Sequence, residues 1–147
     1  MNQAASSHIS PASTGLAVMK VGGTDSGQFL QGQLTQDTLL SEPGAPLLAG
    51  WPNAKGRLNF VAWLLNWQDA FWLVLPAEVA EAAAKRLSMY VLRAQVSIEI
   101  CPAQVRFTSL PNSTETNINS IGDCFYNDHY YQFKPLPNDE RWLTIDL

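Results

Sequence analysis

The sequence predicts an α+β fold: an antiparallel sheet meander with one main helix and one short helix. Three apolar segments rich in Trp, Phe and Val follow one another at residues 46–51, 57–67 and 71–76, separated by "PNAKG" and "QDA". Such segments joined by turn residues are typical of antiparallel strands. Residues 76–93 have helical periodicity. Strands do not alternate with helices as they do in a parallel sheet.

A first strand and the short helix precede this meander. Residues 16–23, "LAVMKVGG", alternate loosely and end on two glycines, which indicates a strand. A helix of two turns follows, with Thr24 or Asp25 as its N-cap, Gln28 as the capping-box partner and Gly32 at its end.

The main helix has charges that suit its dipole. Pro76 or Ala77 lies near its start, acidic residues occupy its first turn, and Lys85, Arg86 and Arg93 come late. Its buried face is predicted to hold Val79, Ala83, Leu87, Tyr90 and Val91.

Polar segments connect the remaining predicted elements. Thr35 or Asp37 is expected to cap one further turn before the loop "SEPGAP". After the main helix, "QVSIEIC" returns to a strand, and "VRFTSL", "DCFYN", "YYQFKPL" and "RWLTIDL" are four more predicted strands. The connection "PNSTETNINSIG" is a poor helix by propensity and periodicity, so we expect a loop there.

The 147 residues suit one domain, which we place at residues 16–147, with residues 1–15 as a disordered lead-in. The lead-in lacks the basic and apolar regions of a secretory signal, and no apolar run reaches the length of a membrane span. We therefore expect a cytoplasmic protein with no membrane partner. A net charge of −4 with nine Lys and Arg argues against nucleic acid as a direct partner.

Few residues offer catalytic or metal chemistry. Cys101 and Cys124 form no CxxC pair, so we expect two reduced structural thiols. His8 lies in the lead-in, His129 is expected in a turn, and acidic pairs at metal-binding spacing are absent from the sequence. The sequence therefore predicts no catalytic residue and no metal site.

The hairpin tip "NAKGR", residues 53–57, has two interpretations. Asn and Gly suit a β-turn, in which Lys55 and Arg57 would serve solubility alone. The same two cations, close to a Trp, would also form a shallow site for an anionic tail. The residues alone leave both interpretations open.

Three motifs give the chain a family resemblance: "FLQGQLTQD", "LAGWPNAKGRL" and "KRLSMYVLRAQVSIEI". In this order and spacing, residues 16–100 resemble the front part of YgfZ-type folate-binding proteins, relatives of the aminomethyltransferase (T protein) of the glycine cleavage system. After Pro102 the resemblance is faint, and residues 102–147 look like a diverged or shortened version of the next strands. The resemblance implies that "FLQGQLTQD" builds a wall beside a folate-binding cavity.

The resemblance also implies the ligand and its binding residues. A pterin needs apolar or aromatic walls and amide partners, and its glutamate tail needs cations. The ligand implied is tetrahydrofolate or another folate, bound weakly because half of the family's cavity is absent. The implied folate-binding residues are Leu16, Gln33, Trp51, Asn53, Lys55, Arg57, Tyr90 and Arg93.

The chain departs from the family at several positions. The T protein has a catalytic Asp just after the hairpin tip, where this sequence has Phe60 and Val61, so the general acid or base for aminomethyl transfer is missing. YgfZ-type proteins lack that Asp too. Their Lys-Gly-Cys-Tyr-x-Gly-Gln-Glu signature is missing here, and Leu16 stands where family members tend to place an aromatic residue or Met.

The function implied is that of a non-catalytic folate-binding protein that assists iron–sulfur protein assembly or repair and tRNA modification, with iron–sulfur proteins as partners. Two alternatives are a truncated family copy acting as a protein–protein interaction module and a residual aminomethyltransferase-like protein.

The aromatic strands near the C-terminus lack an obvious covering layer in the sequence. From an uncovered apolar sheet face we predict a homodimer.

Overall fold

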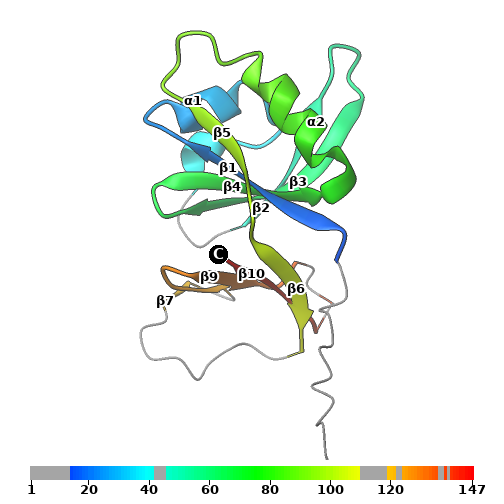
Figure 1. Ribbon diagram of the computed structural model, residues 1–147, viewed down its shortest axis with the longest axis vertical. Coiled ribbons are helices and arrows are strands. Elements are labelled where there is room, and N and C mark those ends of the chain that lie inside the picture. The colour runs from blue at the N-terminus through cyan, green and yellow to red at the C-terminus, as the bar shows by residue number, and fades with distance from the viewer. Residues whose placement is uncertain (1–13, 42–45, 110–118, 122–123, 136–137, 139) are drawn as a thin grey trace, which may run out of the picture.

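The computed structural model describes residues 14–41, 46–109, 119–121, 124–135, 138 and 140–147. Within them, two antiparallel sheets of five strands stack as layers, with helices on the outer side of the first sheet (Figure 1). The first sheet has the order β2 Leu47–Pro52, β3 Leu58–Trp67, β4 Ala70–Pro76, β1 Leu16–Gly22 and β5 Ser97–Cys101. The second has the order β6 Gln104–Thr108, β10 Trp142–Asp146, β9 Tyr130–Phe133, β8 Cys124–Tyr126 and β7 Asn119–Ile121. The helical elements are α1 Ser26–Gln31, the 3-10 turn η1 Thr38–Leu40 and α2 Ala77–Ser88.

The predicted α+β fold is confirmed, and its meander is β2, β3 and β4. β4 lies in the middle of the first sheet, and every residue from Ala70 to Leu75 is buried. A strand that is covered on both faces needs apolar side chains at successive positions. This requirement explains the continuous apolar run "AFWLVL". β2 lies at the sheet edge and leaves Leu48 exposed.

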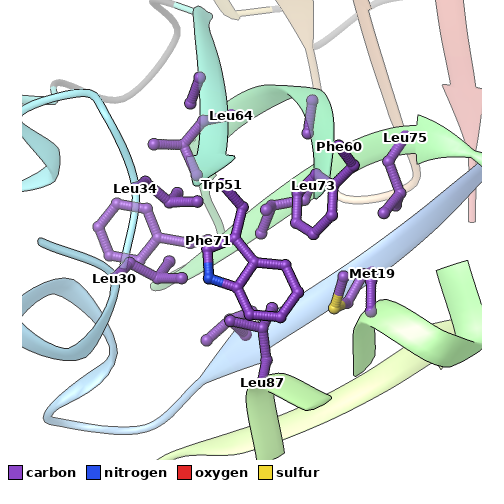
Figure 2. Packing of buried hydrophobic residues seen from close by; sticks show 14 of the residues in the cluster. Met19, Leu30, Leu34, Trp51, Phe60, Leu64, Phe71, Leu73, Leu75 and Leu87 are labelled. Carbon is purple, nitrogen blue, oxygen red and sulfur yellow. The ribbon is translucent and has the colours of Figure 1, made fainter. Parts of the chain in front are cut away.

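One face of the first sheet packs against the helices. Figure 2 shows Trp51 from β2 near the centre of this cluster, with Met19 and Leu73 from other strands and Leu30 and Leu87 from α1 and α2. The last four side chains are fully buried. Burying a side chain of this size contributes about 1.5–3 kcal/mol, so the cluster holds both helices on the sheet.

The opposite face of the first sheet packs against the second sheet. Val18, Leu65 and Trp72 share one buried cluster with Tyr131 and Leu143 from the second sheet. The expectation that the aromatic C-terminal strands lack a covering layer is therefore wrong, because the first sheet covers them. The homodimer was predicted from an uncovered apolar face, and that argument no longer holds. The homodimer itself stays a prediction.

Two hairpins join the layers by hydrogen bonds. The β3–β4 hairpin contributes Trp67 and Gln68, and the β8–β9 hairpin contributes two carbonyl groups. Trp67 Nε1 donates to the carbonyl of Asn127 at 3.1 Å, and Gln68 Nε2 donates to the carbonyl of Asp128 at 2.6 Å. These bonds fix the two hairpin tips against each other.

α2 is shorter than the helix that the sequence predicts. The prediction extended to residue 93, but α2 ends at Ser88, whose hydroxyl donates to the carbonyl of Ala84 at 2.7 Å. Leu87 is the last residue of its buried face. Tyr90, predicted on that face, is 58% exposed, because helical spacing no longer positions side chains beyond the end of a helix.

The capping box predicted for α1 does not form. Asp25 precedes the helix but makes no side-chain cap bond there. Its Oδ2 instead accepts from the amide of Gln95 at 2.7 Å, which joins the start of α1 to the segment before β5. Asp37 caps η1 as predicted, since its Oδ1 accepts from the amide of Leu39 at 3.2 Å.

The predicted loop before β8 contains a strand that the sequence did not indicate. β7, Asn119–Ile121, pairs with β8 at the edge of the second sheet. The rest of that connection, at residues 111–118 and 122, and residues 1–13 of the lead-in, with His8, lie outside the described residues. Thr14, within the predicted lead-in, donates from Oγ1 to the carbonyl of Val105 at 3.0 Å.

Candidate functional site

Residues 33–36, from the "FLQGQLTQD" motif, bind the outer edge of β2. The amide of Thr35 donates to the carbonyl of Gly50 at 2.9 Å, and the amide of Gly50 donates to Thr35 Oγ1 at 2.8 Å. Gln36 Nε2 donates to the carbonyl of Leu48 at 2.9 Å. These contacts satisfy backbone groups that an edge strand would otherwise leave open.

The two glutamines beside Gly32 also have separate structural partners. Gln31 Oε1 accepts from the amide of Thr38 at 2.7 Å, which ties η1 to α1. Gln33 Oε1 accepts from Trp51 Nε1 at 3.4 Å, a long hydrogen bond that orients the indole ring. The motif thus positions Trp51 and the edge of β2.

A cavity of about 150 Å³ lies between α2 and the hairpin of β2 and β3. Trp51 and Phe60 form its aromatic wall, with ring centroids 5.2 Å apart and planes inclined at 48° (Figure 2). The residues that line it are Trp51, Asn59, Phe60, Val79, Ala82, Ala83 and Arg86.

The polar side chains of the cavity can bind a ligand but offer no general base. Asn59 has a neutral amide that both donates and accepts hydrogen bonds. Arg86 has a planar cationic guanidinium, which suits a carboxylate or another anion. The cavity therefore combines an apolar aromatic wall with one anion-binding group.

Asn53 builds the hairpin tip, so its side chain is occupied. Asn53 Oδ1 accepts from the amides of Lys55 and Arg57 at 2.9 and 3.0 Å, and the amide of Asn53 donates to the carbonyl of Arg57 at 2.7 Å. Gly56 has a φ of +77°, which the turn requires. The side chains of Lys55 and Arg57 are exposed, and both are available to a ligand.

The structure does not gather the eight implied folate-binding residues in one place. Trp51 lines the cavity, and Gln33 contacts Trp51. Leu16 is half-buried and packs with the cluster between the two sheets. Tyr90 and Arg93 lie beyond the end of α2 and are exposed.

Asn59 and Arg86 are absent from the residues that the sequence implied for the site. Arg86 follows Val79, Ala82 and Ala83 at helical spacing, so these residues share one side of α2. This helical spacing is the sequence signal that could have placed Arg86 beside the cavity. From the sequence alone, Arg86 is interpreted only as a cation that suits the end of the helix.

A second cleft, of about 380 Å³, lies where β1 meets the segment before β5, lined by residues 23–24 and 95–97. Gly23 has a φ of +108°, and a Cβ there would lie 2.1 Å from the carbonyl oxygen of Gln95. The close approach of the two segments explains this glycine, and the cleft has no charged side chain in its lining.

The described residues form neither a metal-binding cluster nor a membrane-spanning helix. No three His, Cys, Asp or Glu side chains gather there. Cys101 and Cys124 are not joined by a disulfide. Neither helix of the described chain is long and apolar enough to cross a bilayer.

Comparisons with known proteins support the fold. A crystal structure of the glycine cleavage system aminomethyltransferase T from Bartonella henselae superimposes with a TM-score of 0.73 at 15% identity, covering 92% of this chain and 40% of that protein. The chain has an aminomethyltransferase-like fold. Because the match covers 92% of the chain, it includes most of the part after Pro102, where the sequence resemblance is faint.

Comparisons of the amino-acid sequence do not assign the chain to a family. An uncharacterized protein of Haemophilus influenzae is 27% identical over 89 residues, which are 60% of this chain and 32% of that protein. No family model matches the chain. The chain thus spans about a third of the curated relative and two fifths of the T protein.

Proposed function

We propose that this domain binds a folate-type ligand without transforming it. The observation that carries the proposal is the cavity of Trp51 and Phe60 with Arg86 in its lining, within an aminomethyltransferase-like fold. An aromatic ring of the ligand would pack in the cavity, and a carboxylate of its tail would meet Arg86. Asn59 would offer an amide partner to a ring nitrogen or carbonyl.

The volume of the cavity limits the affinity. Sites for small molecules typically measure about 300–1,000 Å³, whereas this cavity measures about 150 Å³. It accommodates a single ring system and leaves the remainder of a folate on the surface. We therefore propose binding in the micromolar range or weaker, about −8 kcal/mol at most.

The side chains of the cavity agree better with ligand binding than with aminomethyl transfer. Phe60 is 6% exposed and packs against Trp51 with the two ring planes inclined, where transfer would need a carboxylate. A phenyl ring accepts no proton. The residual aminomethyltransferase is thus the weaker alternative.

The more specific role comes from the YgfZ-type resemblance. We propose that folate binding serves iron–sulfur protein assembly or repair and tRNA modification, with iron–sulfur proteins as partners. The alternative, a protein-interaction module, is favoured by three exposed apolar side chains directly after α2, those of Met89, Tyr90 and Leu92.

Titration calorimetry with tetrahydrofolate and its polyglutamate tests the ligand. Arg86→Gln is expected to weaken binding about tenfold, the loss of one charge-assisted contact. Lys85→Gln, which removes the same charge one residue away, should have little effect on binding.

Lys55→Ala with Arg57→Ala should weaken polyglutamate binding, while the free energy of unfolding stays within about 0.5 kcal/mol of the wild-type value.

Three outcomes would count against the proposal. The first is no heat of binding at millimolar ligand, and the second is equal binding by Arg86→Gln and the wild type. The third is a large drop in melting temperature with intact binding in the Lys55→Ala and Arg57→Ala variant, which would make the hairpin cations structural. Nanomolar binding would contradict the limit set by the cavity.

A further inference from the structure

Segment 89–93, directly after α2, presents large apolar side chains to solvent. Met89, Tyr90 and Leu92 are 72%, 58% and 86% exposed, which makes them the three most exposed large hydrophobic residues of the described chain. Single exposed apolar residues are common on protein surfaces, but a group of this kind marks an interaction site more often.

The backbone of this segment is held in place by hydrogen bonds. Three successive amides, at residues 89–91, each donate to the carbonyl three residues back, at 3.0 to 3.2 Å. Further along, the amide of Gln95 donates to Asp25 Oδ2 at 2.7 Å, and the amide of Asp25 donates to the carbonyl of Gln95 at 3.2 Å. An apolar group presented on a fixed backbone costs little ordering entropy when it binds.

Cations surround the apolar group. Lys85 and Arg93 are exposed on either side of it. The β2–β3 hairpin, whose tip holds the exposed Lys55 and Arg57, also extends away from the second sheet, with α2 between it and segment 89–93 in Figure 1. Within the described residues, none of these four is found in an ion pair. Segment 89–93 therefore has an exposed cation on each side along a chain of net charge −4, and the acidic residues of α2, Glu78 and Glu81, precede Lys85.

We propose that segment 89–93 is a docking site for an acidic polypeptide segment that carries apolar side chains. Apolar contact with Met89, Tyr90 and Leu92 would supply the buried area, and Lys85 and Arg93 would attract and orient the acidic groups. This inference does not depend on the cavity or on its ligand.

Two other occupants fit the charges less well. A second copy bound about a two-fold axis would bring two copies of Lys85 and Arg93 into one interface, and the added like charge disfavours association. An anionic bilayer would attract this end but repel the remainder of a chain with net charge −4.

Fluorescence anisotropy with two labelled peptides tests the proposal. One peptide alternates Glu with Leu or Phe, and in the other every apolar residue is Ser. The wild type should bind the first peptide about tenfold more tightly than the second, and Met89→Ser with Leu92→Ser should remove about that tenfold difference. Leu48→Ser is the matched control, because Leu48 is 48% exposed on the edge of the first sheet.

A charge test uses the same peptides. Lys85→Gln with Arg93→Gln should weaken binding of both peptides, and added salt should do the same. Lys134→Gln, directly after β9, is the control. Equal binding of the apolar peptide by the wild type and the Met89→Ser and Leu92→Ser variant would overturn the proposal, and so would no binding at all.

Vesicles and light scattering distinguish the other occupants. Binding of the wild type to phosphatidylglycerol vesicles that is lost in the Met89→Ser and Leu92→Ser variant would assign the segment to a membrane surface. A dimer that the same variant dissociates would assign it to a second copy. Either result would overturn an acidic polypeptide as the partner.

Discussion

At the scale of single residues, Gln68 and Asp69 carry backbone strain at the tip of the β3–β4 hairpin. Their φ angles are +53° and +54°, as in the type I′ turns that favour Asn-Gly. Gln68 has a partner there, because its Nε2 donates to the carbonyl of Asp128 at 2.6 Å. Asp69 is exposed. Asp69 is therefore a position where strain can be relieved without disturbing the contact between the hairpins.

Substitution of Asp69 should separate backbone strain from side-chain effects. We expect Asp69→Gly to raise the free energy of unfolding by about 0.5 kcal/mol, because glycine adopts positive φ without a Cβ clash. Asp69→Ala should lower it, so that the two variants differ by about 1–2 kcal/mol. Urea denaturation followed by Trp fluorescence measures both. An alanine variant as stable as the glycine variant would show that this turn is not strained.

At the scale of elements, the sequence predicted the strands of the first sheet and the start of α2 well. Their signals are local: β-branched and aromatic runs, turn residues, and a proline before the helix. The end of α2 was missed because "MYVLR" continues the apolar spacing of the helix while Met89 and Leu92 in fact face solvent. Exposure of that kind depends on what packs against a segment, which periodicity alone does not contain.

The binding of residues 33–36 to the edge of β2 gives a prediction for one element. Thr35→Val keeps the side-chain shape but removes the Oγ1 that accepts from the amide of Gly50. We expect a loss of about 1 kcal/mol in the free energy of unfolding and faster hydrogen exchange at the Gly50 amide. Thr24→Val, an exposed threonine after β1, is the control. Unchanged exchange at Gly50 would show that the edge of β2 is protected by other groups.

At the scale of the whole molecule, neither the stacking of two sheets nor the cavity was accessible from the sequence. The first sheet is apolar on both faces, but nothing local says that its second face meets the C-terminal strands. The cavity depends on Arg86 from α2 lying next to Trp51 from β2, two residues far apart in the chain. Tertiary packing determines both the stacking of the sheets and the cavity, whereas sequence patterns predict single helices and strands.

Tyr131 offers a test of the contact between the layers. It is fully buried among residues of both sheets, and its ring centroid lies 5.5 Å from that of Trp67. Burial, and after it the neighbouring Cys124 thiol, raises the pKa of Tyr131 above its usual value of 10.0. The folded protein therefore keeps the phenol proton at a pH where the unfolded chain loses it. This contribution to stability is complete below pH 10 and falls as the pH rises above it.

We expect the free energy of unfolding to fall as the pH rises from 10 to 11, with Tyr131 accounting for about 1.4 kcal/mol one pH unit above its usual pKa. Tyr131→Phe should remove that part of the loss, because phenylalanine has no proton to give up. Tyr90→Phe is the matched control, since it removes the same hydroxyl from a tyrosine that is 58% exposed and lies outside the contact between the layers. Urea unfolding at pH 8 and pH 11 decides the question. If Tyr131→Phe lost as much stability as the wild type, Tyr131 would have to be open to solvent, and the two layers would not be packed together as described.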